Sequence, residues 1–253
     1  MKPIKLIDGI LTLRRALECD LSINALSNFY YKTLAETDND TVIFCFEGYK
    51  SKQPRMDLYP IYKANRVPAA ESIWKFIELF KKLLRFTPAI QVSVPYREAD
   101  DVIAWFCQKF HTETALYIET NDYDLKQLEL YGNVSSAIPD KAHLPPQYVR
   151  MYKTLVGDSS DNIKGVKGFG EVAFSAIDKD AVNDWLHAGA RLPIPFTIPV
   201  KSQKWILENT AELKVMWEIT GFLPIREDDI NKNMIIGKHM PSEAEKILRE
   251  VML

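Results

Sequence analysis

The sequence predicts an α/β protein with a mostly parallel sheet flanked by helices, followed by a helical region. Short runs rich in β-branched and aromatic residues alternate with stretches of helical apolar spacing in the first half of the chain. Such alternation is typical of a parallel sheet covered by helices. Beyond residue 144 the pattern changes to helices joined by turns. We therefore expect an α/β domain in 1–144 and a helical region in 145–253.

The strands and helices follow from the period of the apolar residues. Strands are expected at Pro3–Ile7, Thr41–Phe46, Ile90–Val94, Thr114–Glu119 and, more weakly, Asn133–Ile138. Helices are expected at Thr12–Glu36, Ala70–Phe86 and Glu98–Phe110, where apolar residues recur three or four positions apart. The prolines of Leu192–Pro199 fix their own torsions and disfavour helix before them, which indicates an extended connection.

Composition limits the class of protein. The chain has 253 residues, 47% hydrophobic and 26% charged, and no window approaches the roughly 18 apolar residues of a membrane span. The N-terminus shows no secretory signal, so we expect a cytoplasmic protein without a membrane partner. Three scattered cysteines form neither a disulfide framework nor a zinc pattern.

The charges are unevenly distributed. The net charge of the chain is only −2, so the whole-chain basicity common in nucleic-acid-binding domains is missing. From Lys50 to Arg85, however, nine Lys and Arg face three acids, a local net of 9 − 3 = +6. A basic segment therefore lies inside a near-neutral chain.

Acidic residues follow four of the expected strands. They are, in order, Asp8, Glu47, then Glu98 with Asp100 and Asp101, and finally Asp122 with Asp124. The carboxyl ends of parallel strands share one edge of a sheet, so these side chains can converge. Crowded carboxylates repel and raise one another's pKa unless cations neutralise them, so the cluster predicts bound metal.

The chemistry of the donors favours a hard ion. Carboxylate oxygens without a Cys or His set suit Mg²⁺, or Mn²⁺, better than zinc. Two such ions about 4 Å apart support phosphodiester hydrolysis. Alternatively, single acids at helix starts are caps that favour the helix dipole. The three acids of Glu98–Asp101, followed by two more after the next strand, exceed what one cap needs.

A glycine-rich loop at 155–170 adds two further carboxylates, Asp158 and Asp161. Its glycines at 165, 168 and 170 would let the backbone approach a phosphate, which the amides of the next helix start could bind without reading bases. An ordinary loop with a glycine cap would explain one glycine but not three beside two acids.

These motifs resemble those of the structure-specific 5′-nucleases, which include phage 5′–3′ exonucleases, flap endonucleases and the 5′-nuclease domain of bacterial DNA polymerase I. The matching stretches are LIDG, FEG, LYPIYKANR, READDVIA, TNDYDLKQL and LVGDSSDNIKGVKGFG, in the order of the family, between about Lys5 and Ile177. The last third of the chain carries no matching motif.

The resemblance implies a PIN-like catalytic domain with a helical arch around 49–85, and a DNA-binding region with a helix–hairpin–helix motif at 155–177. Asp8, Glu98 and Asp100 would hold one metal ion, with Asp101 nearby; Asp122, Asp124, Asp158 and Asp161 would hold a second or bridge to it through water. Glu47 stands where the family usually has aspartate, and its extra methylene would shift the carboxylate. The loop after Asp8 is also shortened, which leaves the role of Arg14 or Arg15 open.

Further roles follow from the resemblance. Lys63 resembles the arch lysine that contacts the scissile phosphate, and Arg66 would lie one helical turn further on; the alternative for Lys63 is a solvated helix lysine. Tyr62 would stack on a base, or else belong to the core. The hairpin would grip duplex phosphates, with K⁺ as a possible helper, through Gly165, Val166, Lys167, Gly168, Phe169 and Gly170.

The expected function is a metal-dependent 5′–3′ exonuclease and flap endonuclease, monomeric, in a bacterial cell or a phage-infected host. Its substrates would be DNA with 5′ flaps, nicks or RNA primers, and residues after Asp180 could contact a polymerase or a single-strand-binding protein. Two alternatives stay open. A PIN-type ribonuclease uses a similar acidic cluster but usually lacks the glycine hairpin, and a DNA-binding protein with a decayed site would have lost ligands.

Overall fold

The computed structural model describes residues 2–138 and 144–252, which form two compact units. The first unit comprises Met1–Ser51, Pro68–Pro139 and Pro224–Leu253, and the second comprises Lys52–Val67 and Asp140–Leu223. The expected ranges 1–144 and 145–253 differ from these units, because residues 224–253 return to the first one. The expected boundary adjoins residues 139–143, which lie outside the described residues.

Within the described residues, the first unit contains a six-stranded sheet in the order β5–β4–β1–β2–β3–β6. The strands are β1 Ile4–Asp8, β2 Thr41–Cys45, β3 Ile90–Val92, β4 Leu116–Glu119, β5 Val134–Ser136 and β6 Met234–Ile236. All pairings are parallel except that of β6 with β3. The predicted α/β class and its five predicted strands are therefore confirmed.

The strand order creates a switch point at β1. The chain runs from β1 outward through β2 to β3, and then returns to place β4 on the other side of β1. In open parallel sheets, ligands bind beyond the carboxyl ends of the strands at such a switch point. Asp8 pairs in register with Cys45 of β2, and the preceding Ile7 pairs with Glu119 of β4. The end of β1 is thus the natural place for a site.

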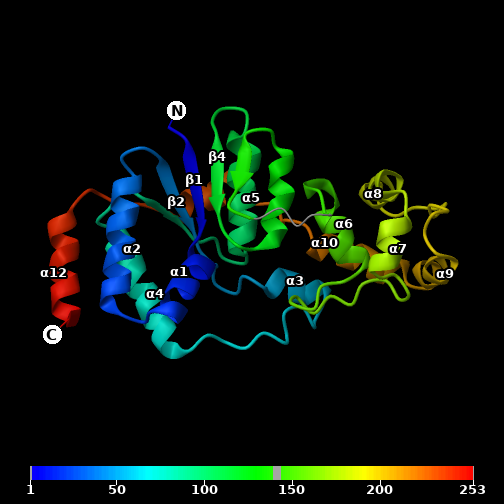
Figure 1. The fold of residues 1–253 in the computed structure, drawn as a ribbon, viewed down its shortest axis with the longest axis horizontal. Helices are drawn as coiled ribbons and strands as arrows, with labels where there is room; N and C mark the ends of the chain where they lie inside the picture. Colours follow the sequence, from blue (N-terminus) through cyan, green and yellow to red (C-terminus); the bar gives the residue numbers. More distant parts are fainter. Residues whose placement is uncertain (1, 139–143, 253) are drawn as a thin grey trace. The chain divides into compact units, whose positions relative to one another are not determined.

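Helices cover both faces of this sheet (Figure 1). One face packs against α1 Gly9–Cys19, α2 Ile23–Glu36, α4 Glu71–Leu84 and α12 Pro241–Met252. Phe44, Phe80 and Tyr30, all fully buried, form the centre of that layer. The other face packs against α5 Ala99–Phe110, whose Ile103 and Cys107 are fully buried. Burial of these apolar faces supplies the main drive for folding.

Two elements of the first unit differ from the sequence-based expectation. The single helix predicted at Thr12–Glu36 is two helices, because Ser22 accepts a hydrogen bond from the amide of Ala25 at 3.1 Å and begins α2 anew. Strand β6 was not predicted. It is a three-residue edge strand with Ile235 and Ile236 exposed, so it lacks the buried run that marks a strand in sequence. Helix α11 Glu227–Lys232 leads into it.

The second unit is helical. It contains α3 Gln53–Leu58, α6 Val149–Leu155, α7 Glu171–Ala176, α8 Lys179–His187, α9 Val200–Glu208 and α10 Thr210–Ile219, with a short 3₁₀ turn η2 at Pro146–Tyr148. Buried Arg55 of α3 donates to the carbonyl oxygens of Ile219 and Gly221 at 3.1 and 2.9 Å. These bonds satisfy carbonyls at the end of α10 and tie α3 to it. In the part of the chain that the structure describes, no helix has the length and apolar character needed to cross a bilayer.

Candidate metal site and hairpin

Two predicted ligands lie at the ends of neighbouring strands. Asp8, 6% exposed, is the last residue of β1, and its carboxylate caps α1 by accepting from the amide of Leu11 at 3.1 Å. Glu47 follows β2, and its carbonyl oxygen accepts from the hydroxyl of Ser93 at 3.0 Å. That bond connects the segment after β2 with the segment after β3. Both segments are therefore held together at the carboxyl edge of the sheet.

The buried thiol of Cys45 lies within the electrostatic influence of two of the predicted ligands. Burial raises the pKa of this thiol well above its usual value, and the negative charges of Asp8 and Asp100 raise it further. Asp8 ends β1, whereas Asp100 lies in the first turn of α5, after β3. Acids from two separate elements therefore act electrostatically on the same buried thiol.

The remaining acids at the start of α5 are structural as well. Glu98 and Asp101, each 1% exposed, form a reciprocal capping box: each side chain accepts from the backbone amide of the other residue, that from Glu98 to Asp101 Oδ2 at 3.1 Å. The sequence offered three acids here, more than one helix cap needs. Two of them, Glu98 and Asp101, cap the start of α5 together. Each carboxylate has a second oxygen, so capping and metal binding are compatible.

Asp122 and Asp124 follow β4, at the start of the 3₁₀ helix η1 Tyr123–Leu130. The Asp122 carboxylate accepts from the amide of Asp124 at 3.0 Å, and the Thr120 hydroxyl accepts from the amide of Asp122 at 3.0 Å. These local bonds fix a turn at the switch-point strand. The turn places both residues directly after the carboxyl end of β4, the neighbour of β1 in the sheet.

Asp158 and Asp161 belong to the second unit and lie among cations. The ammonium of Lys153 is 2.5 Å from Asp158 and 3.8 Å from Asp161. Burial raises the pKa of Asp158, but Lys153 and two hydrogen bonds from Ser160 outweigh it, so this pKa lies below its usual value. In the second unit, the ammonium of Lys153 therefore balances negative charge of Asp158 and Asp161.

Lys63 and Arg66 also converge on Asp161. The guanidinium of Arg66 donates to Asp161 Oδ1 at 2.6 Å, and the ammonium of Lys63 lies 4.0 Å from the same oxygen. Lys63 is buried, with a backbone φ of 52°, in a run of turns rather than a helix. The alternative of a solvated helix lysine is therefore wrong, and so is the expected helical turn between Lys63 and Arg66.

Glycines shape the loop between α6 and α7. Gly157 and Gly165 have φ of 101° and 69°, and a Cβ on either would lie within 2.7 Å of facing backbone. Gly168 has a φ of 81° at the tip. Among the described residues, no backbone carbonyl accepts from the amides of Lys167, Gly168 or Gly170. The hairpin therefore offers several amides without a backbone acceptor among the described residues, a group suited to bind a phosphate.

Comparison with known proteins identifies the class. A family described as "5′-3′ exonuclease, N-terminal resolvase-like domain" matches residues 6–151, more than half of the chain. The chain belongs to this 5′–3′ exonuclease family. Thermostable DNA polymerase I of Thermus aquaticus is 32% identical over 211 residues, covering 78% of this chain but 25% of the polymerase. The 5′-3′ exonuclease of Bacillus subtilis is 32% identical over 197 residues, covering 66% of each chain.

Solved structures share the fold of this exonuclease family member. T5 5′-exonuclease with bound zinc superposes with a TM-score of 0.70 at 16% identity, covering 99% of this chain and 98% of the other. The catalytic core of Rad2 with DNA superposes with a TM-score of 0.54 at 14% identity, covering 98% and 86%. The chain spans only a quarter of the length of the polymerase from Thermus aquaticus. The activity of that whole polymerase is therefore not assigned to this chain.

The structure corrects the expected nucleic-acid contact of Tyr62. It also limits the expected contacts of Val166 and Phe169 to their backbone atoms. Tyr62 is 3% exposed and packs in the core of the second unit, so its ring has no free face for a base. The core alternative is therefore right and the stacking role is withdrawn. Val166 and Phe169 of the hairpin are also buried, at 3% and 4% exposure. Their side chains anchor the loop, which leaves only backbone at these two positions for phosphate contact.

Sequence reasoning missed Lys153. It lies in the last turn of α6, five positions before Asp158, and its ammonium lies against both acids of the loop. A cation one turn ahead of a pair of carboxylates was the available signal. Lys126, in the first unit, was missed too: it is buried in η1 and pairs with Glu129 at 2.7 Å.

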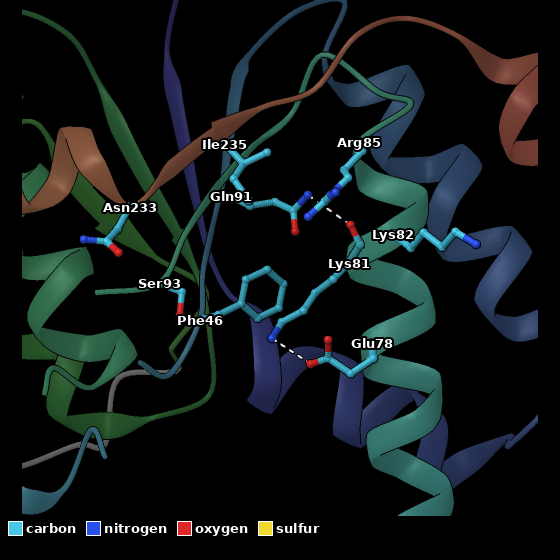
Figure 2. A pocket seen from close by; sticks show the side chains of 9 residues that line it. All are labelled: Phe46, Glu78, Lys81, Lys82, Arg85, Gln91, Ser93, Asn233 and Ile235. Atoms are coloured by element: carbon cyan, nitrogen blue, oxygen red, sulfur yellow. Dashed lines mark hydrogen bonds and ion pairs between the residues drawn. The ribbon is translucent and has the colours of Figure 1, made fainter. Parts of the chain in front are cut away.

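A hollow of about 460 Å³ in the first unit lies between α4 and the β2, β3 and β6 strands. Figure 2 shows Lys81 reaching past the ring of Phe46 to Glu78, with which it pairs at 2.9 Å, while Gln91 donates to the Lys81 carbonyl at 3.0 Å. None of the predicted metal ligands lines this hollow. The candidate site is therefore the acidic edge and not the hollow.

Proposed function

We propose that this protein is a divalent-metal-dependent 5′–3′ exonuclease and flap endonuclease that hydrolyses phosphodiesters near 5′ ends of DNA or RNA/DNA duplexes. The observation that carries the proposal is the position of Asp8 at the end of β1, the switch point of the sheet, in a chain of the 5′–3′ exonuclease family. Asp122 and Asp124 follow the other strand of that switch point.

The donor set fits a divalent ion. The residues at the edge offer carboxylate oxygens and no His or Cys pattern, which suits Mg²⁺, with Mn²⁺ as a substitute. The ligands we propose in the first unit are Asp8, Glu47, Glu98, Asp100, Asp101, Asp122 and Asp124. Asp158 and Asp161 remain ligands by resemblance to the family. Two bound ions would lower the pKa of water and stabilise the leaving oxygen.

The remaining roles fall to cations and the hairpin of the second unit. Lys63 and Arg66 carry positive charge that can stabilise negative charge developing on the scissile phosphate. Their common partner Asp161 restricts their positions before substrate binds. The amides of Lys167, Gly168 and Gly170, which have no backbone acceptor among the described residues, would hold the duplex backbone without reading sequence. K⁺ at the hairpin is a further proposal from the resemblance.

The test uses end-labelled flap, nicked and RNA-primed duplexes. Asp122→Ala and Asp124→Ala should each abolish Mg²⁺-dependent cleavage while duplex binding in EDTA persists, because the hairpin does not use these carboxylates. The matched control is Asp38→Ala, which removes an exposed acid that precedes the amino end of β2, at the opposite end of that strand from the carboxyl ends. Full cleavage by either variant would defeat the assignment.

The same substrates separate the alternatives. A ribonuclease would cut single-stranded RNA and leave flapped DNA intact. A DNA-binding protein without activity would bind branched DNA with strong salt dependence and cut nothing in Mg²⁺ or Mn²⁺. We further propose a monomer in the cytoplasm of a bacterial cell or a phage-infected host. A polymerase or single-strand-binding protein is proposed to contact the chain after Asp180.

A further inference from the structure

The hollow of the first unit has a positively charged wall. Its volume of about 460 Å³ is in the range of small-molecule sites. Three cations and one carboxylate line it, namely Lys81, Lys82, Arg85 and Glu78. Lys81 pairs with Glu78 at 2.9 Å, whereas Lys82 and Arg85 form no ion pair with any residue that the structure describes. The wall therefore has positive charge that this part of the chain does not balance.

The opposite wall contains a polar side chain inside a buried strand. Gln91, 6% exposed, is the middle residue of β3 and lies between Phe44 of β2 and Ile235 of β6. Its amide nitrogen donates to the carbonyl oxygen of Lys81 at 3.0 Å. Its Oε1 atom accepts no hydrogen bond from the described residues. A nearly buried acceptor without a donor is costly, so a ligand that donates to it would gain affinity.

Helix capping explains only part of this arrangement. Cations at the end of α4 favour the negative end of the helix dipole, which accounts for Lys82 and Arg85 taken singly. It does not account for the free acceptor of Gln91. Figure 2 shows the side chains of Arg85 and Gln91 directed toward the hollow, from the end of α4 and from β3. The hollow thus presents a guanidinium and an amide oxygen, with apolar surface from Phe46 and Ile235.

We propose that this hollow is a binding site for a nucleoside 5′-monophosphate. The guanidinium of Arg85 would bind the phosphate through paired hydrogen bonds. An amino or hydroxyl group of the nucleoside would donate to Gln91 Oε1, and its apolar surface would contact Phe46 and Ile235. Inorganic phosphate alone would leave both the acceptor and the apolar surface without contact. The choice of a nucleotide rests on the proposed function, because an exonuclease that cuts from 5′ ends releases molecules of this class.

The test is isothermal titration calorimetry with deoxyadenosine 5′-monophosphate in EDTA, so that no divalent ion contributes. The wild-type protein should bind one nucleotide per chain. Arg85→Met removes the charge of an exposed side chain and should weaken binding about tenfold or more. Gln91→Met removes the acceptor and should weaken binding of the nucleotide while leaving the affinity for inorganic phosphate unchanged. Urea unfolding shows whether each variant is folded.

The matched control is Lys75→Met. Lys75 is an exposed cation on the same helix that pairs with Glu71 and does not line the hollow, so its removal should leave nucleotide binding unchanged. Absence of saturable binding by the wild type would overturn the inference. Unchanged nucleotide affinity in Arg85→Met or in folded Gln91→Met, or equal losses in Arg85→Met and Lys75→Met, would overturn it as well.

Cleavage of flapped DNA in Mg²⁺ by the same wild-type protein separates this inference from the proposed function. Cleavage without nucleotide binding would overturn the inference alone. Nucleotide binding without cleavage would overturn the proposed function and support the hollow as a nucleotide site. The two readouts are independent because none of the proposed metal ligands lines the hollow.

Discussion

The guanidinium of Arg66 donates to the carboxylate of Asp161 at 2.6 Å, although the two residues are 95 positions apart. Asp161 is 6% exposed at its side chain, whereas Arg66 is 43% exposed. The buried carboxylate therefore holds one end of an otherwise solvated cation. Lys63 lies 4.0 Å from the same oxygen on the buried side. One acid thus restricts the positions of both cations proposed to act on the scissile phosphate.

The exposure of Arg66 predicts a separation of activity from stability. Arg66→Ala should lower the single-turnover cleavage rate by a factor of about 10² or more, the range for removing one group that stabilises developing charge. Its free energy of unfolding should change by less than about 1 kcal/mol, since half-exposed ion pairs contribute little. Quench-flow kinetics and urea unfolding measure the two quantities. Arg66→Lys tests whether charge alone suffices, and a normal rate in Arg66→Ala would contradict the assigned role.

Gly48 should be intolerant of a side chain. A Cβ at this position would lie 1.7 Å from the carbonyl oxygen of Val94. The amide of Gly48 donates to the carbonyl oxygen of Arg97 at 3.1 Å. The close approach joins the segment after β2 to that after β3, next to Glu47. Gly48→Ala should therefore lower the free energy of unfolding by about 1–3 kcal/mol, as overpacking does.

Gly132 is the matched control for this substitution. A Cβ there would meet nothing within 4 Å, and its φ is not positive. Gly132→Ala should leave the unfolding midpoint in urea unchanged or raise it slightly. Equal destabilisation by both substitutions would show that the close approach at Gly48 does not matter.

The three cysteines should differ in reactivity. Cys19 is exposed, whereas Cys45 and Cys107 are buried. Burial raises the pKa of Cys107 to about 12, so its thiol stays protonated and inaccessible at any mildly alkaline pH. A thiol-reactive dye should label Cys19 alone in the native protein, with the other two reacting only after unfolding. Rapid native labelling of Cys107 would contradict the packing of α5 on the sheet.

Acid should weaken the second unit through His187. Partial desolvation lowers the pKa of His187 below its usual value, the charge of Arg150 lowers it further, and Asp184 opposes them. The unfolded chain then binds more protons than the folded one, so stability falls as pH decreases through about 6.5. His187→Gln should make urea midpoints between about pH 7 and about pH 5 less dependent on pH. An unchanged slope would contradict the lowered pKa of His187, whose imidazole packs edge-on against Trp217.

Sequence predicted the elements whose signal is local. Strands β1 and β2 are runs of buried β-branched and aromatic residues, so their period is visible in the chain. Strand β6 forms because it pairs with Ile90–Val92, a long-range relation that three residues, two of them exposed, do not reveal. The break before α2 did have a local signal, the cap residue Ser22, which apolar periodicity across the break concealed.

Some features of the candidate site were likewise predictable from sequence, and others were not. Acids after parallel strands were predictable, because sheet geometry alone brings strand ends to one edge. The capping box of Glu98 and Asp101 was not, since a carboxylate that caps and one that binds metal look alike in sequence. Tyr62 was wrong for a related reason: an aromatic beside a lysine fits either a base-stacking surface or the core that it joins here. The role of Lys153 could not be predicted, because it depends on the packing of α6 against the loop.

Binding of Mn²⁺, followed by the loss of its free-ion electron paramagnetic resonance signal, tests the central claim most directly. The wild-type protein should bind two ions per chain, Asp122→Ala should lose at least one of them, and Asp38→Ala should bind as the wild type does. Saturable binding lost with Asp122 would support carboxylates gathered at the switch point of the sheet. No stoichiometric binding by the folded wild-type chain would contradict a metal-dependent nuclease.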